Sequence, residues 1–328
     1  MSMSMGKAVG MFDFIRFRDA GKYARRILGA RYLERSDFLP ELSQAEIARM
    51  ERVAEAVRPD DPEEILVFGV LPRSGTNYVR DILAMHPDVC ADPADLYEFP
   101  LLHAASGAKA LRNEFVSMFP RNGGVVGSYD MLAYMASAWL RSLQAEIGTK
   151  RILLKSPHVH NLSLATALFP QAKIVLCLRD GRDVVDSTMN TFSSFSLTRK
   201  TFSQLAYEWK LATEAILEYM PGGAREHPNI VVVRYEDLQA NEEAGVRRLL
   251  RHTGLPADSF SFEDMRALPV RGSSRSKLSN QDQWKPQEKS DDFKPVRRWQ
   301  SWPKRKTLRF DRIAGATLRR AGYDDALG

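Results

Sequence analysis

The segment that most constrains the fold is an apolar run followed at once by a glycine-containing turn and a helical pattern. Residues 65–70 read Ile-Leu-Val-Phe-Gly-Val, residues 73–76 read Arg-Ser-Gly-Thr, and apolar residues recur at helical spacing over 78–83. Such a strand–turn–helix aims backbone N–H groups and the positive end of a helix dipole at one place. The sequence therefore predicts an anion-binding loop.

The side chains of this loop also suit phosphate or sulfate oxygens. Arg73 offers a planar fork of donors, and Ser74 and Thr76 add hydroxyl groups. A Walker-type P-loop fits poorly, because five residues separate Gly69 from Gly75 and Thr76 stands where that motif needs lysine. Helix capping alone is the structural alternative for such a turn.

A second anion-binding pattern follows further along the chain. Residues 173–178 form a short apolar run with β-branched members, which is typical of a buried parallel strand. Arg179 follows the run directly, and Ser187 lies on the helix that is expected to begin near Asp183. Ligands of open α/β sheets bind at the carboxyl ends of strands, so Arg179 and Ser187 can converge on one phosphate. A surface salt-bridge cluster is the alternative.

Together these segments resemble the sulfotransferase family over residues 65–255, with features closer to its bacterial and protein-tyrosine branches. Members of that family use 3′-phosphoadenosine 5′-phosphosulfate (PAPS) as the sulfuryl donor and release 3′-phosphoadenosine 5′-phosphate (PAP). The resemblance implies that the early loop grips the 5′-phosphosulfate, that Arg179 and Ser187 hold the 3′-phosphate, and that a late loop closes over the nucleotide. The implied donor-binding residues are Arg73, Ser74, Gly75, Thr76, Asn77, Arg179, Ser187, Arg271, Gly272 and Ser273.

The resemblance also implies catalytic roles. Arg73 would neutralise the phosphosulfate, and Lys155, at the end of an expected strand, would donate to the bridging oxygen as the S–O bond breaks. An acceptor hydroxyl needs a general base. The protein-tyrosine branch uses a glutamate soon after the first helix, and this chain has none at the matching position. The candidates are Glu98 and Asp95 equally, then Asp92, with His158 as an alternative because small-molecule sulfotransferases use a histidine.

Apolar runs alternate with helical patterns, which predicts an α/β chain: a P-loop-like three-layer fold with a central, mostly parallel sheet flanked by helices. The expected strands are 65–70, 151–154, 173–178 and 230–234, and the expected helices are 77–85, 131–146, 160–168, 183–189, 202–219, 242–252 and 308–321. We expect a basic helical extension over 1–60, a core over 61–270, and a lid-like segment with a terminal helix over 271–328.

The lid-like segment is polar from residue 272 to residue 303 and contains three scattered tryptophans, Trp284, Trp299 and Trp302. This composition is typical of a segment that becomes ordered when a ligand binds, or of a disordered linker.

The net charge of +6 and the pI near 9.3 fit a basic pocket for an anionic donor. No helix-turn-helix, RNA-binding or zinc-finger pattern is present, so we do not expect nucleic acid as a partner. The first 35 residues interleave aromatic and basic side chains, which predicts either a helix on an anionic membrane surface or one packed on the domain.

The two cysteines exclude a disulfide framework, and neither zinc-ligand spacing nor an acidic cluster indicates a metal. No apolar run is long enough to span a membrane, and the first residues lack the apolar region of a signal peptide. We therefore expect a cytoplasmic protein, with contact at the inner membrane face as an option for its basic first residues.

The expected function is transfer of a sulfuryl group from PAPS to an acceptor hydroxyl on a carbohydrate, lipid, tyrosine or small alcohol. Two alternatives stay open at this point. One is a P-loop-like kinase or other phosphoryl transferase, and the other is a nucleotide-binding protein with a degenerate catalytic site.

Overall fold

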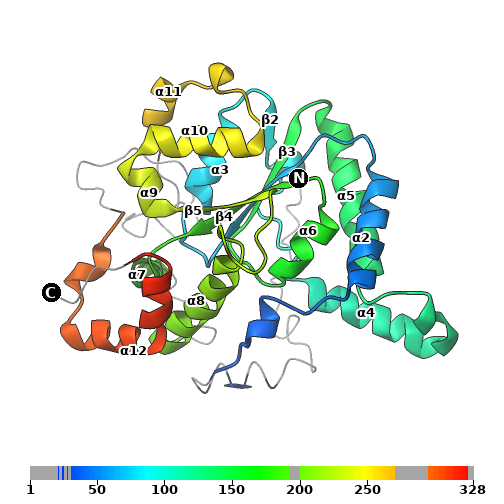
Figure 1. Cartoon of the computed structure of the whole chain (residues 1–328), viewed down its shortest axis with the longest axis horizontal. Helices are drawn as coiled ribbons and strands as arrows, with labels where there is room; N and C mark the ends of the chain where they lie inside the picture. Colours follow the sequence, from blue (N-terminus) through cyan, green and yellow to red (C-terminus); the bar gives the residue numbers. More distant parts are fainter. Residues whose placement is uncertain are drawn as a thin grey trace, which may run out of the picture.

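The computed structural model describes residues 31–191, 200–269 and 295–323, together with Gly21, Ala24, Arg25 and Leu28. Its centre is a parallel sheet with the strand order β2-β3-β1-β4-β5 (Figure 1). The strands are β1 (Ile65–Gly69), β2 (Val89–Ala91), β3 (Arg151–Ser156), β4 (Lys173–Leu178) and β5 (Ile230–Arg234). A sheet whose strands are all parallel is normally covered on both faces, because each crossover helix must pack on one of them.

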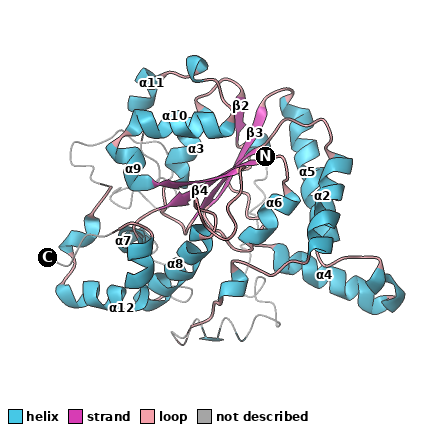
Figure 2. Ribbon diagram, viewed as in Figure 1, coloured by secondary structure: helices cyan, strands magenta, loops and turns pink. Residues whose placement is uncertain are grey.

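Helices surround the sheet on both sides (Figure 2). In the described chain they are α2 (Gln44–Val57), α3 (Thr76–Ala84), α4 (Ala105–Met118), α5 (Asp130–Ile147), α6 (Ala165–Leu168), α7 (Gly181–Thr191), α8 (Phe202–Leu217), α9 (Tyr235–Ala240), α10 (Glu242–Thr253), α11 (Phe262–Arg266) and α12 (Lys304–Arg320). Short 3₁₀ turns used below are η4 (Pro93–Asp95), η5 (Pro120–Gly124), η6 (Leu162–Leu164) and η9 (Arg298–Ser301).

The alternation of side chains along each strand divides the core into two clusters, one on each face of the sheet. On one face Ile65, Val67 and Val175 pack with side chains of α3 and α10. On the other face Leu66, Phe68 and Leu176 pack with side chains of α5, α8 and α12. These two clusters make the fold a helix–sheet–helix sandwich, which confirms the expected three-layer α/β class.

The four expected strands are all present, and the sequence reading missed β2. That strand has only three residues, and Cys90, which the sequence placed in a loop-like stretch, belongs to it. Three residues are too few to show a hydrophobic period. The helix expected over 160–168 begins later, at α6 after η6, because Asn161 has a left-handed φ of 55° that interrupts helical backbone.

The N-terminal part that the structure describes packs on the helix layer, where α2 contacts α5 and α6. The helix α2 begins with a capping box, in which the Ser43 and Glu46 side chains bond to each other's backbone N–H groups. Its buried residues Met50 and Val53 join the core cluster that also contains residues of α5 and α6. The proposed boundary at residue 60 stays a prediction, and residues 1–20 lie outside the described part.

The expected lid falls partly outside the described chain. Residues 270–294, including Trp284, Arg271, Gly272 and Ser273, are not described. The stretch from residue 295 to residue 303 is described, and it buries Trp299 and Trp302 against the core. The helix α12 that follows matches the expected terminal helix.

Within the described ranges, no helix is long and apolar enough to cross a membrane. The same residues contain no group of three or more histidine, cysteine, aspartate or glutamate side chains that could hold a metal ion. Cys90 and Cys177 are both free, and burial in β4 raises the pKa of the Cys177 thiol.

Candidate active site

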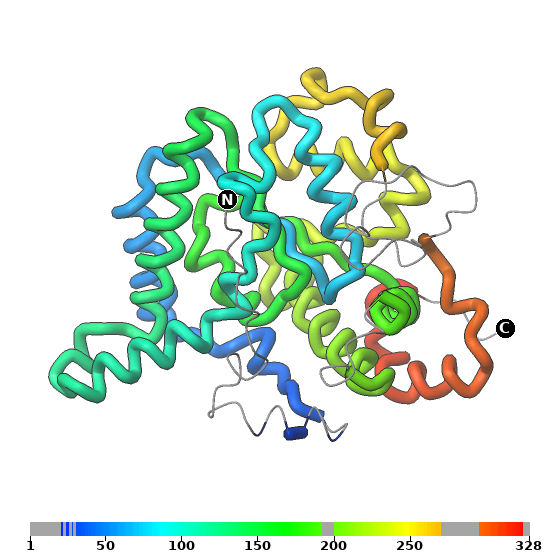
Figure 3. Tube along the Cα trace, turned by 180° about the vertical axis from the view of Figure 1, so that it is seen from behind, coloured from blue at the N-terminus to red at the C-terminus, as the bar shows by residue number. Residues whose placement is uncertain are grey.

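The site is built on the carboxyl edge of three neighbouring strands. β1 lies between β3 and β4, with Val67 opposite Lys155 and Gly69 opposite Cys177. The loop after β1, the end of β3 and the residue after β4 therefore meet at one edge of the sheet, where parallel α/β folds bind ligands (Figure 3). We call this region the donor edge: residues 70–77 with Lys155, Arg179 and Ser187.

The loop after β1 turns through two left-handed residues, Arg73 with φ 77° and Gly75 with φ 95°. A Cβ atom added to Gly75 would lie 2.4 Å from the Tyr235 ring, so both the backbone and the packing require glycine there. The Ser74 hydroxyl is buried beneath the loop next to Gly69, with no hydrogen-bond partner in the described chain. Thr76 and Asn77 open α3, so the loop delivers the start of a helix to the donor edge.

Three of the expected donor-binding side chains come together from three separate segments. The Nε atom of Arg73 donates to the Ser187 Oγ atom at 3.0 Å. The Nη1 atom of Arg179 donates to the backbone oxygen of Arg73 at 2.6 Å, and its guanidinium lies 4.6 Å from the centre of the Tyr235 ring. The loop after β1 and the end of β4 therefore form one continuous site.

The donor edge has an excess of positive charge. Burial, together with the neighbouring charges of Arg179 and Arg298, lowers the pKa of Arg73 to about 10. Guanidinium groups crowded together in a partly buried place repel one another, and an anion between them would relieve that repulsion. The chemistry of the site therefore fits a phosphate or sulfate group.

Sequence reasoning missed Arg298, which lies on η9, pairs with Asp186 at 3.8 Å and lowers the pKa of Arg73 through its charge. The available signal was the pair Arg297-Arg298 directly before Trp299. The pair lies within the expected lid, and its spacing does not distinguish one arginine from the other.

The turn that carries Arg179 is fixed from several directions. The Asp180 N–H donates to Glu236 at 3.0 Å, and the Tyr323 hydroxyl donates to the same carboxylate at 3.0 Å. The indole Nε1 of Trp209 donates to the backbone oxygen of Arg179 at 3.0 Å, and that tryptophan is fully buried. A relatively rigid frame therefore positions the guanidinium of Arg179.

The C-terminal segment is fixed to the same turn. Asp183 accepts hydrogen bonds from the backbone N–H groups of Arg297 at 2.7 Å and Trp299 at 3.2 Å. Burial raises the pKa of the Asp183 carboxyl, against the opposing charge of Arg179. Arg182 pairs with Asp180 at 2.6 Å and lies 3.5 Å from the Trp299 ring centre, so its role here is to join the segments.

Lys155 is the buried cation at the end of β3. Its Nζ atom lies 3.2 Å from Glu98 Oε1 and 3.8 Å from the centre of the Tyr97 ring. Burial lowers the pKa of Lys155, and the nearby carboxylate of Glu98 opposes that shift. Glu98 itself is 45% exposed at its side chain, so it faces the open side of the site.

The three candidate carboxylates after α3 are now distinguishable. Glu98 alone is in direct contact with Lys155 among them. Asp92 is bonded to Arg80, which also binds Asp81 at 2.6 Å. Asp95 has a left-handed φ of 57° in η4 and is exposed, and its side chain makes no hydrogen bond or ion pair with the described residues.

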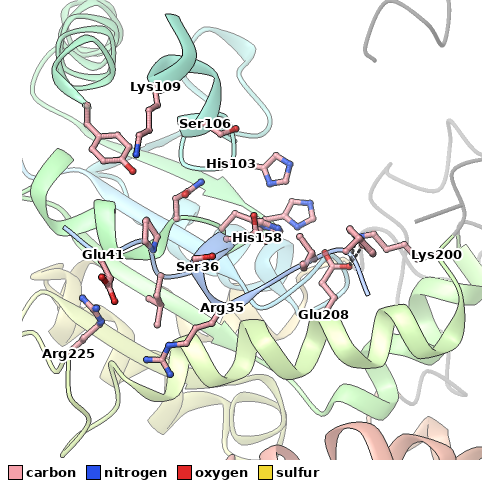
Figure 4. A pocket seen from close by; sticks show the side chains of 18 residues that line it. Arg35, Ser36, Glu41, His103, Ser106, Lys109, His158, Lys200, Glu208 and Arg225 are labelled. Carbon is pink, nitrogen blue, oxygen red and sulfur yellow. Dashed lines mark hydrogen bonds and ion pairs between the residues drawn. The ribbon is translucent and has the colours of Figure 1, made fainter. Parts of the chain in front are cut away.

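His158 lies in a separate pocket of about 1050 Å³ (Figure 4). Its ring centre is 5.1 Å from that of His103 and 5.6 Å from that of His160. Glu208, which is bonded to Lys200, closes the wall beside the rings and accepts a hydrogen bond from Tyr32 at 3.1 Å. We call this the histidine pocket.

Burial controls the charge of the histidine pocket. It lowers the pKa of His158 to about 3, with the charge of His160 acting in the same direction, and it lowers the pKa of His103. The Nδ1 atom of His158 is buried and has no hydrogen-bond partner among the described residues. At neutral pH the rings of His158 and His103 are therefore uncharged and offer nitrogen atoms to a polar ligand.

Two chain segments run side by side from the donor edge to the histidine pocket. The Phe99 N–H donates to the backbone oxygen of Lys155 at 2.7 Å, and the Asn161 side chain donates to the backbone oxygen of Leu102 at 2.7 Å. One segment carries Glu98 and His103, and the other carries Lys155 and His158. His158 is three residues from Lys155, which limits their Cα separation to about 10 Å.

Comparison with known proteins gives two kinds of similarity. Residues 64–259, more than half of the chain, match the model of the sulfotransferase family. The chain is 27% identical over 214 residues to protein-tyrosine sulfotransferase A of Caenorhabditis elegans, covering 62% of this chain and 54% of that protein. It is 27% identical over 203 residues to protein-tyrosine sulfotransferase 1 of Danio rerio, covering 58% and 53%. The chain thus spans about half the length of these curated relatives.

A solved structure shares the fold. The sulfotransferase domain from the olefin synthase of Synechococcus PCC 7002 aligns with a TM-score of 0.50 at 19% identity, covering 79% of this chain and 96% of that domain. This structural alignment shows a common fold. The family match covers the strands, the loop after β1 and the end of β4 described above, and the chain belongs to the sulfotransferase family.

Proposed function

We propose that the protein transfers a sulfuryl group from PAPS to an acceptor hydroxyl. The observation that carries this proposal is the group of arginines at the donor edge: Arg179 bonds to the backbone of Arg73, and the charges of Arg179 and Arg298 both act on Arg73. The buried Lys155 lies at the end of the neighbouring strand β3. PAPS has a phosphosulfate at one end and a 3′-phosphate at the other, and such a pair of anions would neutralise this cluster. Membership of the sulfotransferase family supports the same donor.

The charged residues of the donor edge and the nearby Arg298 have separate roles in this proposal. The start of α3 and Arg73 would hold the phosphosulfate, and Arg179 with Ser187 would hold the 3′-phosphate. Arg298 would add a further cation, which is a role that the sequence did not suggest. Residues 271–273, which the family resemblance places over the nucleotide, lie outside the described chain and keep that role as a prediction.

Lys155 and Glu98 would then act as hydrogen-bond donor and general base, respectively. In the transfer, the acceptor oxygen forms a bond to sulfur while the bond from sulfur to the bridging oxygen breaks, and its electron pair stays on the nucleotide phosphate. Lys155 would donate to that oxygen, and Glu98 would take the proton from the acceptor hydroxyl. The 3.2 Å contact between the two side chains supports Glu98 over Asp95 and Asp92.

The acceptor would occupy the histidine pocket next to the donor edge. Support comes from the two hydrogen-bonded segments that join the two regions and from the polar wall of the pocket. His158 has too low a pKa to be an efficient base near neutral pH, so we assign it to binding the acceptor. The protein-tyrosine relatives make a tyrosine hydroxyl one reasonable acceptor, beside carbohydrate, lipid and small alcohols.

A binding experiment tests the donor assignment without knowledge of the acceptor. Calorimetry on the full chain should show that PAP binds more tightly than 5′-AMP, which lacks the 3′-phosphate. An excess of ATP should not displace bound PAP. Transfer of labelled sulfate from PAPS to fractions of a cell extract would then identify the acceptor. Equal affinity for PAP and 5′-AMP, or transfer of the γ-phosphate of ATP, would contradict the proposal.

A further inference from the structure

The helix α4 is exposed along almost its whole length. Of its 14 residues only Ala105 is buried, and Figures 1 and 3 show the helix extending away from the sheet. Helices of this length depend on packing of an apolar face for their stability. We call α4 and the turn after it, residues 105–126, the apolar arm.

The apolar arm carries a stripe of large apolar side chains. Leu111, Phe115 and Met118 follow at spacings of four and three residues, which puts them on one face of the helix. They are 59%, 37% and 63% exposed, and Phe119 and Val125 on the turn are 64% and 70% exposed. An exposed apolar cluster of this kind marks a surface that contacts a partner or a membrane.

The arm is held in shape before any partner arrives. The guanidinium of Arg112 donates to the backbone oxygen of Val126 at 2.6 Å and of Gly123 at 3.2 Å, which ties the turn back onto the helix. At the other end Ser106 and Lys109 line the histidine pocket. Docking of the arm would therefore involve a rigid element whose base belongs to the pocket wall.

The charge of the apolar arm indicates which kind of partner can bind to it. The arm has three cations, Lys109, Arg112 and Arg121, and a single acid, Glu114. A second copy of this chain would bring the same cations, and the first 35 residues are also basic within a chain of net charge +6. Both of these occupants would be repelled, whereas an anionic lipid surface is attracted to cations beside an apolar stripe.

We propose that the apolar arm docks on an anionic membrane surface. Phe115, Met118 and Phe119 enter the boundary between headgroups and acyl chains, and Arg121 contacts the lipid phosphates. This surface is distinct from the donor edge, so the proposal stands independently of the transfer reaction.

Vesicle flotation of the full chain tests the proposal. Wild-type protein should float with vesicles of phosphatidylcholine and phosphatidylserine and bind less to phosphatidylcholine alone. The triple variant Phe115→Ser, Met118→Ser, Phe119→Ser should lose binding by about tenfold or more, because exposed apolar side chains supply the insertion energy. Leu308→Ser is the matched control, since Leu308 is 44% exposed on α12, and it should bind like wild type.

A second variant separates charge from insertion. Arg121→Glu should weaken binding to the phosphatidylserine vesicles and leave the weak binding to phosphatidylcholine unchanged. If thermal unfolding shows that the triple variant is not folded, Met118→Ser alone replaces it, with a smaller expected loss.

Three results would overturn the assignment. If wild-type protein does not float with phosphatidylserine vesicles, the apolar arm does not bind anionic membranes. A folded triple variant that still floats would place the membrane contact elsewhere. A dimer by light scattering that the triple variant dissociates would assign the arm to a second copy of the chain.

Discussion

The donor edge and the histidine pocket reach their geometry in different ways. Residues of the donor edge follow the ends of neighbouring strands, so the register of the sheet fixes their relative positions. The histidine pocket takes its wall from the segment before α2, the start of α4, the loop after β3, and α8. No strand pairing sets the spacing between those segments.

This difference matches the two binding tasks: the nucleotide is the same in every reaction, whereas the acceptor can differ between relatives. A nucleotide of constant shape can be held by rigid strand ends with buried cations, such as Lys155 and Arg179 at 2% and 7% exposure. An acceptor can vary between relatives, and loops accommodate such variation without disturbing the sheet. Substitutions should therefore affect rate and nucleotide affinity at the donor edge, and acceptor affinity in the pocket.

The largest effect is expected from removing the cations that face the transferred group. Lys155→Ala and Arg73→Ala should each lower kcat/KM by about a thousandfold, because each removes a preorganised charge at the reacting oxygens. Transfer of labelled sulfate measures the loss. Lys304→Ala, an exposed lysine at the start of α12, is the control and should leave the rate unchanged. A rate within tenfold of wild type in either variant would remove that residue from the mechanism.

Substitution of Glu98, beside Lys155, and of His158, in the histidine pocket, should affect different kinetic constants. Glu98→Gln should lower kcat by about a hundredfold or more with little change in acceptor KM, as expected for loss of a general base. His158→Asn should mainly raise the acceptor KM, because a ring with a pKa near 3 is already neutral at working pH. Steady-state kinetics with one acceptor distinguish the two outcomes, and the reverse pattern would make His158 the base.

A smaller effect is expected on the affinity for the nucleotide when Arg179 is replaced. Arg179→Ala should weaken PAP binding by about tenfold to a hundredfold, which is the range for loss of charged hydrogen bonds. Affinity for 5′-AMP should stay unchanged, since that nucleotide has no 3′-phosphate, and this serves as the internal control. Calorimetry that finds equal losses for both nucleotides would show that Arg179 supports the fold of the turn instead.

The smallest change concerns pH. Lys155 donates only when protonated, and burial lowers its pKa, so activity should fall with rising pH earlier than an exposed lysine would allow. Lys155→Arg should remove this fall, because arginine stays protonated over the same pH range. The pH profile of kcat/KM measures the alkaline limb. An unchanged alkaline limb in Lys155→Arg would contradict the role of Lys155.

The sequence predicted the fold class and the strands at the donor edge because those signals are local. Residues 65–70 and 173–178 are continuous apolar runs, and each is followed directly by its polar residues. β2 was not predicted, because a strand of three residues cannot show a hydrophobic period. α4 was also missed, since a helix with a single buried residue has no clear core-facing pattern in its sequence.

The sequence could not order the candidate bases or find the third arginine. Glu98, Asp95 and Asp92 lie within seven positions of each other, and only the turn at η4 decides which one faces Lys155. Arg298 reaches the donor edge from more than a hundred residues beyond Arg179, through contacts between Asp183 and the backbone of residues 297 and 299. Contacts between such distant segments leave no trace in local spacing.

The buried indole of Trp209 gives the protein an intrinsic optical sensor. Its N–H is bonded to the backbone of Arg179, and its ring lies against Gly181, where an added Cβ would come within 2.4 Å of it. Any shift of that turn when the guanidinium engages a ligand must move a carbonyl dipole against the indole. If binding of the nucleotide shifts that turn, the emission of this tryptophan should change with it, and titrations could follow the change without a label.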